Sequence, residues 1–197
     1  MRYTQWGNRR KQGDEHVVSL LDDQGSQILD LPQNWPSEEF GVTVDGQEWR
    51  VLATDTDLQA TLPGGQVFSA NSGDKKFTRA KRLEIQLGQP ISAINEQRND
   101  WVYVASDAEE TKLGQFSGGN NGVRKSITEF EEDSGLGREE KIFLSLVTKR
   151  TLESRLSVST WSIIIGLVLA TIDHEAKAPL AYLDRDYAFC VPAGGRH

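Results

Sequence analysis

At 197 residues, the chain is long enough for one domain with a substantial hydrophobic core. Its formal net charge of −7 excludes the overall positive field that attracts nucleic acid, so we expect no nucleic-acid partner. The single cysteine, Cys190, excludes an internal disulfide framework and a cysteine-based zinc site.

The N-terminal residues 1–15 are polar and contain glycine, which predicts a flexible arm. They include no apolar segment of the kind that a secretory signal requires, so we expect a cytoplasmic protein. The folded domain is therefore expected to begin at residue 16.

The next part of the chain alternates short β-rich segments with turn residues. Strands are expected at 16–21, 26–31, 42–44, 47–53 and 66–70. Between 42–44 and 47–53 stands Asp45-Gly46, a dipeptide typical of a two-residue hairpin turn. These segments predict a series of antiparallel strands.

Further strands follow between residues 82 and 130. Residues 82–87 alternate strictly, with Leu83, Ile85 and Leu87 on one face, which predicts a half-buried strand. The remaining strands are expected at 90–94, 101–105, 111–116 and 123–130. The glycine-rich residues 118–126 lack a glycine directly before Lys125, so we interpret them as a hairpin turn and not as a phosphate-binding loop.

A β-rich segment at 141–148 precedes the most apolar part of the chain, residues 158–172. Residues 156–172 carry no charge, which is short of the about 20 apolar residues that a membrane span needs. A helix that is hydrophobic on all sides must be buried in protein or in lipid. We expect 158–172 to form a helix enclosed by the preceding strands, and a membrane anchor is the alternative.

Enclosing the helix in the sheet would bury both the apolar face of the sheet and the whole helix. The predicted fold is therefore mainly β (α+β): an antiparallel, barrel-like sheet of about ten to twelve strands wrapped around one hydrophobic helix near the C-terminus. This domain is expected to cover residues 16–175. The tail at 176–197 is expected to pack on the barrel or on a partner.

This order of elements resembles the tubby C-terminal-like superfamily, which includes the LURP-one-related proteins and the phospholipid scramblases. The likeness lies in the strand, Asp/Gly turn and strand at 18–28, in 141–147 as the last barrel strand, and in 161–173 as the central helix. The resemblance implies a non-enzymatic module that binds phosphoinositides through basic side chains. No acidic loop has the ligand spacing of a calcium site, so a calcium response is not implied.

Five cations lie within eight residues, from Lys75 to Arg82. Adjacent lysines and arginines supply several charge-assisted hydrogen-bond donors, so this cluster is the candidate site for an anionic headgroup. The alternative, which the residues alone favour, is a solvated edge strand that lysines guard against aggregation. The candidate ligand-binding residues are Lys75, Lys76, Arg79, Lys81 and Arg82.

No catalytic residues, metal ligands or cofactor are predicted. The three histidines are scattered, and the paired glutamates stand in hydrophilic segments where their pKa has no reason to shift. Three hypotheses therefore stay open: a tubby-like binding module for anionic lipid, a membrane surface or a protein partner, including a second copy of the chain; a small enzyme or ligand-binding barrel with its site at a barrel mouth; and a membrane-anchored protein.

Overall fold

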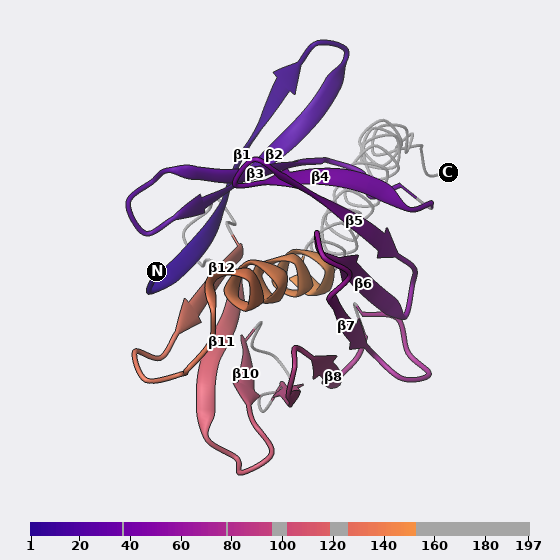
Figure 1. The fold of residues 1–197 in the computed structure, drawn as a ribbon. Helices are drawn as coiled ribbons and strands as arrows, with labels where there is room; N and C mark the ends of the chain where they lie inside the picture. Colours follow the sequence, from indigo (N-terminus) through magenta and orange to yellow (C-terminus); the bar gives the residue numbers. More distant parts are fainter. Residues whose placement is uncertain (37, 78, 96–101, 119–125, 153–197) are drawn as a thin grey trace, which may run out of the picture. The chain divides into compact units, whose positions relative to one another are not determined.

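A computed structural model of the chain describes residues 1–36, 38–77, 79–95, 102–118 and 126–152. These residues form twelve β-strands followed by a helix at residues 138–152, which we name the central helix (Figure 1). The strands are β1 (Tyr3–Gln12), β2 (Glu15–Asp22), β3 (Gln27–Pro32), β4 (Phe40–Val44), β5 (Gln47–Ala53), β6 (Asp57–Thr61), β7 (Val67–Asn71), β8 (Arg82–Gln86), β9 (Pro90–Ile94), β10 (Val102–Ser106), β11 (Lys112–Gly118) and β12 (Ser126–Phe130).

All twelve strands belong to one antiparallel sheet with the order β3-β2-β1-β12-β11-β10-β9-β8-β7-β6-β5-β4. Most strands pair with their neighbours in sequence, and the pairing of β1 with β12 brings the first and last strands together. The sheet curls around until its two edge strands, β3 and β4, come near each other without a hydrogen-bonded ladder (Figure 1). The result is a nearly closed barrel, as the strand pattern predicts.

The central helix occupies the interior of this barrel (Figure 1). Its apolar side chains are at most 1% exposed: Ile142, Phe143, Leu144, Leu146, Val147 and Leu152. The ring of Phe143 lies 5.6 Å from the ring of Phe68 on β7, and Trp49 on β5 packs edge-on against Phe68. The inward faces of the strands and the helix therefore form one hydrophobic core.

The prediction that residues 141–147 form the last barrel strand is wrong, because these residues are helical. Their isoleucine, phenylalanine and valine favour β-structure locally, but burial on all sides removes the periodicity that separates a strand from a helix. The helix begins with a capping arrangement. The backbone N–H of Gly137 donates to the Glu140 carboxylate (2.7 Å), and the Gly137 carbonyl accepts from the N–H of Lys141 (3.1 Å).

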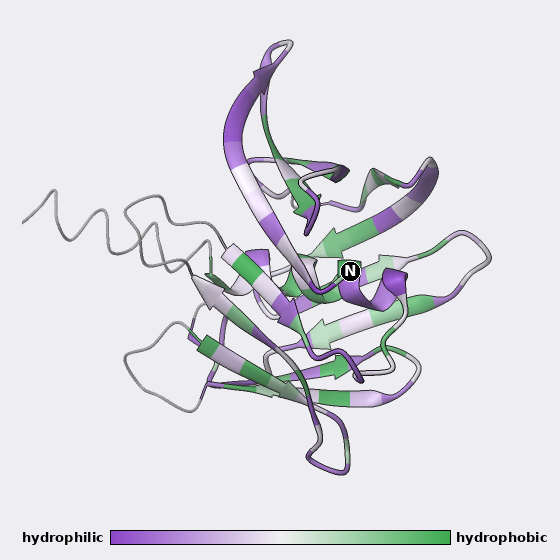
Figure 2. Cartoon of the chain, turned by 90° about the vertical axis from the view of Figure 1, so that its left-hand side faces the viewer, coloured by the Kyte–Doolittle hydropathy of each residue, from purple (hydrophilic) through white to green (hydrophobic). Residues whose placement is uncertain are grey.

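The prediction of a flexible arm is also wrong for residues 3–12, which form β1. Inside the barrel, Thr4 and Trp6 are buried, and Trp6 Nε1 donates to the carbonyl of Ser145 on the helix (3.0 Å). Beyond a register shift after Trp6, the strand continues with β2 as a hairpin that projects from the barrel (Figure 1). This projecting half of β1 is mainly hydrophilic (Figure 2), which explains its arm-like composition.

Two local predictions are confirmed. Asp45 and Gly46 connect β4 and β5 with φ values of 49° and 78°, the left-handed conformation that a two-residue hairpin turn requires. Leu83, Ile85 and Leu87 are each at most 2% exposed and face the core. The strand β6 was not predicted from the sequence.

Other predictions concern residues outside the described ranges. These are the apolar helix at 158–172, most of the glycine-rich turn at 118–126, and the tail at 176–197. Among the described residues, none of the helical segments combines the length and hydropathy needed to cross a bilayer. Among the described residues, the helix that the barrel encloses is the central helix at 138–152 (Figure 1).

Candidate functional site

The predicted basic cluster lies on the connection between β7 and β8. We name residues 75–82 the basic loop; the structure describes all of them except residue 78. All five predicted cations are exposed: Lys75, Lys76, Arg79, Lys81 and Arg82. The structure therefore brings the five together on one surface segment, most of it outside the strands, and only Arg82 begins a strand.

The backbone of the basic loop is held by buried neighbours. Phe77 and Ala80 are each 1% exposed and point into the core between the exposed cations. The N–H of Phe77 donates to the carbonyl of Asp55 (3.0 Å), and the hydroxyl of Tyr103 donates to the carbonyl of Ala80 (2.5 Å). These two buried side chains and two hydrogen bonds hold the loop backbone in place beneath its exposed cations.

Further hydrogen bonds close the two ends of the loop. The hydroxyl of Ser72 donates to the carbonyl of Lys75, and the N–H of Asn95 donates to the carbonyl of Lys81 (2.8 Å). Within the loop, the N–H groups of Arg79 and Ala80 both donate to the carbonyl of Lys76. The cations are therefore displayed from a tight, hydrogen-bonded turn.

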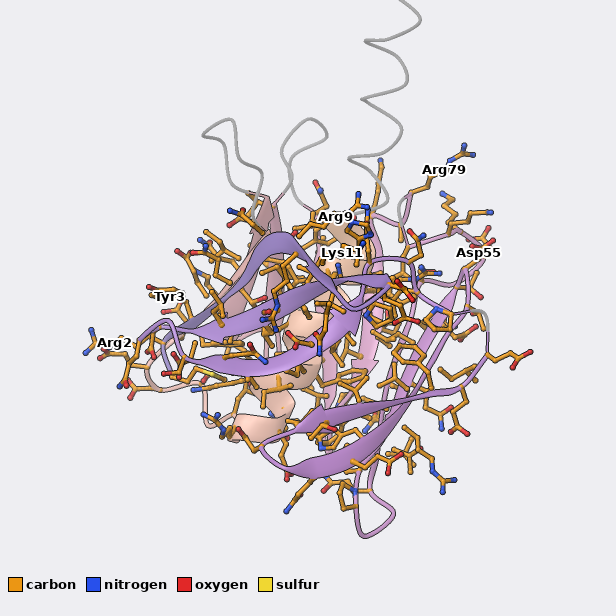
Figure 3. The ribbon with its side chains drawn as sticks, turned by 90° about the horizontal axis from the view of Figure 1, so that it is seen from above. Arg2, Tyr3, Arg9, Lys11, Asp55 and Arg79 are labelled. Atoms are coloured by element: carbon orange, nitrogen blue, oxygen red, sulfur yellow. The ribbon has the colours of Figure 1, made fainter. Side chains whose placement is uncertain are left out.

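Two of the five cations already have acidic partners. Lys76 Nζ lies 2.6 Å from Asp55, and Arg82 Nε lies 2.6 Å from Glu84. Within the described part of the chain, the other three cations, Lys75, Arg79 and Lys81, form no ion pair. Figure 3 shows Arg79 extending away from the barrel. These three side chains are free to meet an anion from solvent.

Asp55 connects the basic loop to the end of the central helix. A hydrogen bond from the Lys76 ammonium, the charge of Lys76 and, more weakly, the charge of Arg150 hold the pKa of the Asp55 carboxyl below its usual range. Arg150, in the last described turn of the helix, donates to the carbonyl of Thr54 (2.6 Å). Its guanidinium also lies 5.8 Å from the ring of Trp35. One short turn, residues 54–56, thus contacts both the loop and the helix.

At the other end of the barrel, a hollow of about 460 Å³ lies beside the start of the central helix. Its floor includes the buried rings of Trp49 and Phe68. On its rim, Arg138 donates two hydrogen bonds to the Asp45 carboxylate, at 2.7 and 3.0 Å. This pair, with the hydrogen bond as the largest cause, lowers the pKa of Asp45 and raises that of Arg138. The volume lies within the range of small-molecule sites, about 300–1,000 Å³.

A second hollow, of about 530 Å³, lies between the edge strands β3 and β4. On the β3 side, Asp30 accepts hydrogen bonds from Arg10 (2.6 Å), Ser19 (2.6 Å) and Gln27 (3.2 Å). These bonds satisfy the Asp30 carboxylate within the protein, so it offers little to a ligand.

The other carboxylates with a shifted pKa belong to surface turns. Hydrogen bonds from Thr56, Asn71 and Thr54 lower the pKa of Asp57, and the backbone N–H of Arg2 lowers that of Asp23. Such shifts stabilise turns and need no catalytic explanation. Within the described ranges, no group of three or more acidic, histidine or cysteine side chains is placed to hold a metal ion.

Sequence reasoning found the cations of the basic loop but missed the residues that organise them. Asp55 and Tyr103 lie 20 or more residues away in sequence, so their contact with the loop leaves no local signal. Phe77 does carry a signal, because one aromatic residue among five cations indicates an inward anchor. Comparison of the chain with protein-family models, with curated proteins and with solved structures gave no match.

Proposed function

We propose that this chain is a non-enzymatic module that binds anionic lipid headgroups at a membrane surface through the basic loop. The observation that carries the proposal is the combination of three exposed, unpaired cations with an anchored backbone. Lys75, Arg79 and Lys81 have no acidic partner among the described residues, while Phe77 and Ala80 fix the loop in the core. An ordered loop loses little conformational entropy when it binds.

The expected strength follows from the charges. Each basic residue close to an anionic membrane contributes about 1 kcal/mol, so three contribute roughly 3 kcal/mol, or roughly 150-fold in affinity. The net charge of −7 opposes this attraction only weakly for acids far from the surface, because the field is screened over about 8 Å at physiological ionic strength. Binding should therefore be local to the loop and sensitive to salt.

We also infer a distant relationship to the tubby C-terminal-like superfamily. A twelve-stranded, nearly closed antiparallel barrel around one helix supports this inference. The likeness of residues 141–147 to the last barrel strand of the superfamily does not support it, because those residues form the enclosed helix. The superfamily's binding of phosphoinositides through basic side chains agrees with the proposed use of the basic loop.

Sedimentation with lipid vesicles tests the proposal. The chain is mixed with phosphatidylcholine vesicles that contain or lack phosphatidylserine, at low ionic strength and at about 0.15 M salt. The variant Lys75→Gln/Arg79→Gln/Lys81→Gln should lose binding to the anionic vesicles. The matched control, Arg2→Gln/Arg50→Gln/Lys112→Gln, removes the same charge from exposed positions elsewhere and should keep most of it. Equal binding by both variants would overturn the proposal.

The hollow beside the central helix supports a second candidate function, the binding of a small apolar molecule at the barrel mouth. Its floor is aromatic, and its rim carries the polar side chains Gln47, Gln66 and Glu139. An environment-sensitive dye, anilinonaphthalene sulfonate, is a suitable probe. This candidate predicts that Gln66→Trp, which fills the hollow, abolishes the fluorescence of the bound dye, and unchanged fluorescence would contradict it.

A further inference from the structure

The connections at the two ends of the barrel differ in the cations that they carry. Because the strands are antiparallel, successive connections alternate between the end where the central helix begins and the end where it reaches residue 152. At the first end lie six connections, residues 23–26, 45–46, 62–66, 87–89, 107–111 and 131–137. All six are described, and together they contain eight acidic residues and no lysine or arginine. We name this the acidic end.

The opposite end is the basic end. It carries the basic loop, Arg150 in the last described turn of the helix, and the projecting β1–β2 hairpin with Arg9, Arg10 and Lys11. The described connections at this end also contain five acidic residues, Asp14, Glu38, Glu39, Asp55 and Asp74. Figure 3 shows Arg9 and Lys11 toward the same end of the barrel as Arg79. The exposed cations of this end gather on the basic loop and the hairpin, whereas the connections of the acidic end contain acidic residues and no cation.

The pairing register of β1 with β2 determines on which face of the hairpin the side chains of Arg9 and Lys11 lie. Arg9 lies opposite Val18, and Lys11 lies opposite His16. Residues directly opposite each other share one face of a sheet, and Val18 belongs to the hydrophobic core. Arg9 and Lys11 therefore continue the inward face of the strand beyond the barrel, where nothing apolar covers them and both are exposed.

These two cations are also unpaired within the described part of the chain. Their neighbour Arg10 points to the other face, where it binds Asp30 at 2.6 Å and Gln27 at 3.1 Å. Arg9 and Lys11 have no such partners. The hairpin therefore resembles the basic loop in the property that matters for binding, which is exposed positive charge on an ordered backbone.

The hairpin and the basic loop rise from roughly opposite sides of the barrel. In the sheet order, four strands, β12, β11, β10 and β9, separate β1 from β8, and five strands lie between β1 and β7 by the same route. In a nearly closed ring of twelve strands this is close to half of the circumference (Figure 1). Two cationic elements spaced across one end fit an extended flat surface better than one small ligand.

We infer that the β1–β2 hairpin is a second contact with the same anionic membrane, and this inference rests on the proposed function of the basic loop. Arg9 and Lys11 bind headgroups on one side of the barrel while Lys75, Arg79 and Lys81 bind on the other. The two contacts seat the basic end on the membrane and turn the acidic end toward solvent. Like-charge repulsion between the acidic connections and the lipid disfavours the reverse orientation.

Vesicle binding by the full chain tests the inference with two variants of equal charge. Arg9→Gln/Lys11→Gln removes two cations from the hairpin. Arg2→Gln/Lys112→Gln removes two cations that border the acidic end, where each pairs with a glutamate. For phosphatidylcholine vesicles containing phosphatidylserine, the hairpin variant should bind roughly thirtyfold more weakly than the native chain. The acidic-end variant should change binding by less than about threefold.

The outcomes separate the inference from the proposed function. If the loop variant loses binding while the hairpin variant equals the acidic-end variant, the inference is overturned and the proposed function stands. If the native chain does not bind the anionic vesicles, both are overturned. A hairpin variant that loses affinity for duplex DNA but not for vesicles would identify a nucleic acid as the ligand and would also overturn the inference.

Discussion

The hydroxyl of Thr4 lies 2.6 Å from the hydroxyl of Ser145, although the two residues are 141 positions apart. Ser145 also donates to the carbonyl of Lys141 (2.7 Å), so it accepts the proton of Thr4. Both residues are fully buried. This contact connects the first strand to the central helix, and a second buried hydroxyl pair, Thr128 and Thr148 (2.7 Å), connects β12 to the same helix.

Removing both hydroxyls of this pair should cost less than the sum of the costs of removing each one alone. Ser145→Ala leaves the buried hydroxyl of Thr4 without a partner, and we expect a loss of about 1–3 kcal/mol in the free energy of unfolding. In Thr4→Val/Ser145→Ala no such hydroxyl remains, so the loss should be smaller than the sum of the two single variants. Denaturant unfolding of the four proteins measures this coupling, and strictly additive losses would show that the hydroxyls do not interact.

Phe143 tests the position of the enclosed helix. Its ring is fully buried and packs on Phe68, so Phe143→Ala should lower the free energy of unfolding by about 3–5 kcal/mol. Leu52→Ala is a suitable comparison, because Leu52 is 36% exposed and its truncation should cost about 1 kcal/mol or less. Thermal unfolding measures the melting temperatures of the two variants. Equal melting temperatures would contradict a core that is centred on residues 138–152.

The sequence predicts the barrel because each strand has one solvent-exposed face, which produces an alternating pattern of polar and apolar residues. The alternation of Leu83, Ile85 and Leu87 and the Asp45-Gly46 turn are local signals that survive in the fold. The central helix leaves no such signal, because burial on every side erases its amphipathic pattern. One periodic clue remains: Lys141, Ser145 and Thr148 recur at helical spacing and face β1 and β12.

Acid should release the contact between the β4–β5 turn and the start of the helix. Hydrogen bonding to Arg138 lowers the folded-state pKa of Asp45, so the pair contributes stability above the ordinary carboxyl pKa near 4. That contribution is lost as the pH falls through the lowered pKa. Both side chains are nearly half exposed, so solvent screening limits the contribution to at most about 1 kcal/mol.

The variant Asp45→Asn isolates this effect, because asparagine also accepts the left-handed backbone of the turn. Native chain and variant should differ in melting temperature at pH 7 and converge as the pH falls through the lowered pKa of Asp45. A difference that persists unchanged in acid would assign the effect to the turn and not to the ion pair.

The candidate site was only partly predictable. The cluster of five cations in eight residues is apparent from the sequence alone. Asp55, which pairs with one of them, comes from the β5–β6 turn and is distant in sequence. The sequence predicts a flexible arm that includes Arg9 and Lys11, because half of β1 is polar on both faces. Only the pairing of β1 with β2 and β12 shows that this polar stretch extends an ordered strand.

Asp55 should weaken membrane binding, because it places a negative charge beside the basic loop and pairs with Lys76. Asp55→Asn removes that charge and frees Lys76, and we expect about fivefold tighter binding to anionic vesicles, the effect of about one charge. Glu109→Gln, in a connection at the acidic end, changes the net charge equally. Glu109→Gln should leave the affinity for anionic vesicles unchanged. If both variants bind more tightly by the same factor, the gain comes from the net charge and not from the position of Asp55.

The central claim is that the basic end faces the membrane, and a distance-dependent probe tests it most directly. Cys190 is the only cysteine, so a Cys190→Ser background allows one fluorophore at Gln12→Cys, near the tip of the β1–β2 hairpin, or at Ala108→Cys, in a connection at the acidic end. The vesicles carry a nitroxide quencher on the lipid headgroup. Strong quenching at position 12 with little at position 108 is the predicted result. Equal quenching at both positions, or stronger quenching at 108, would contradict the orientation.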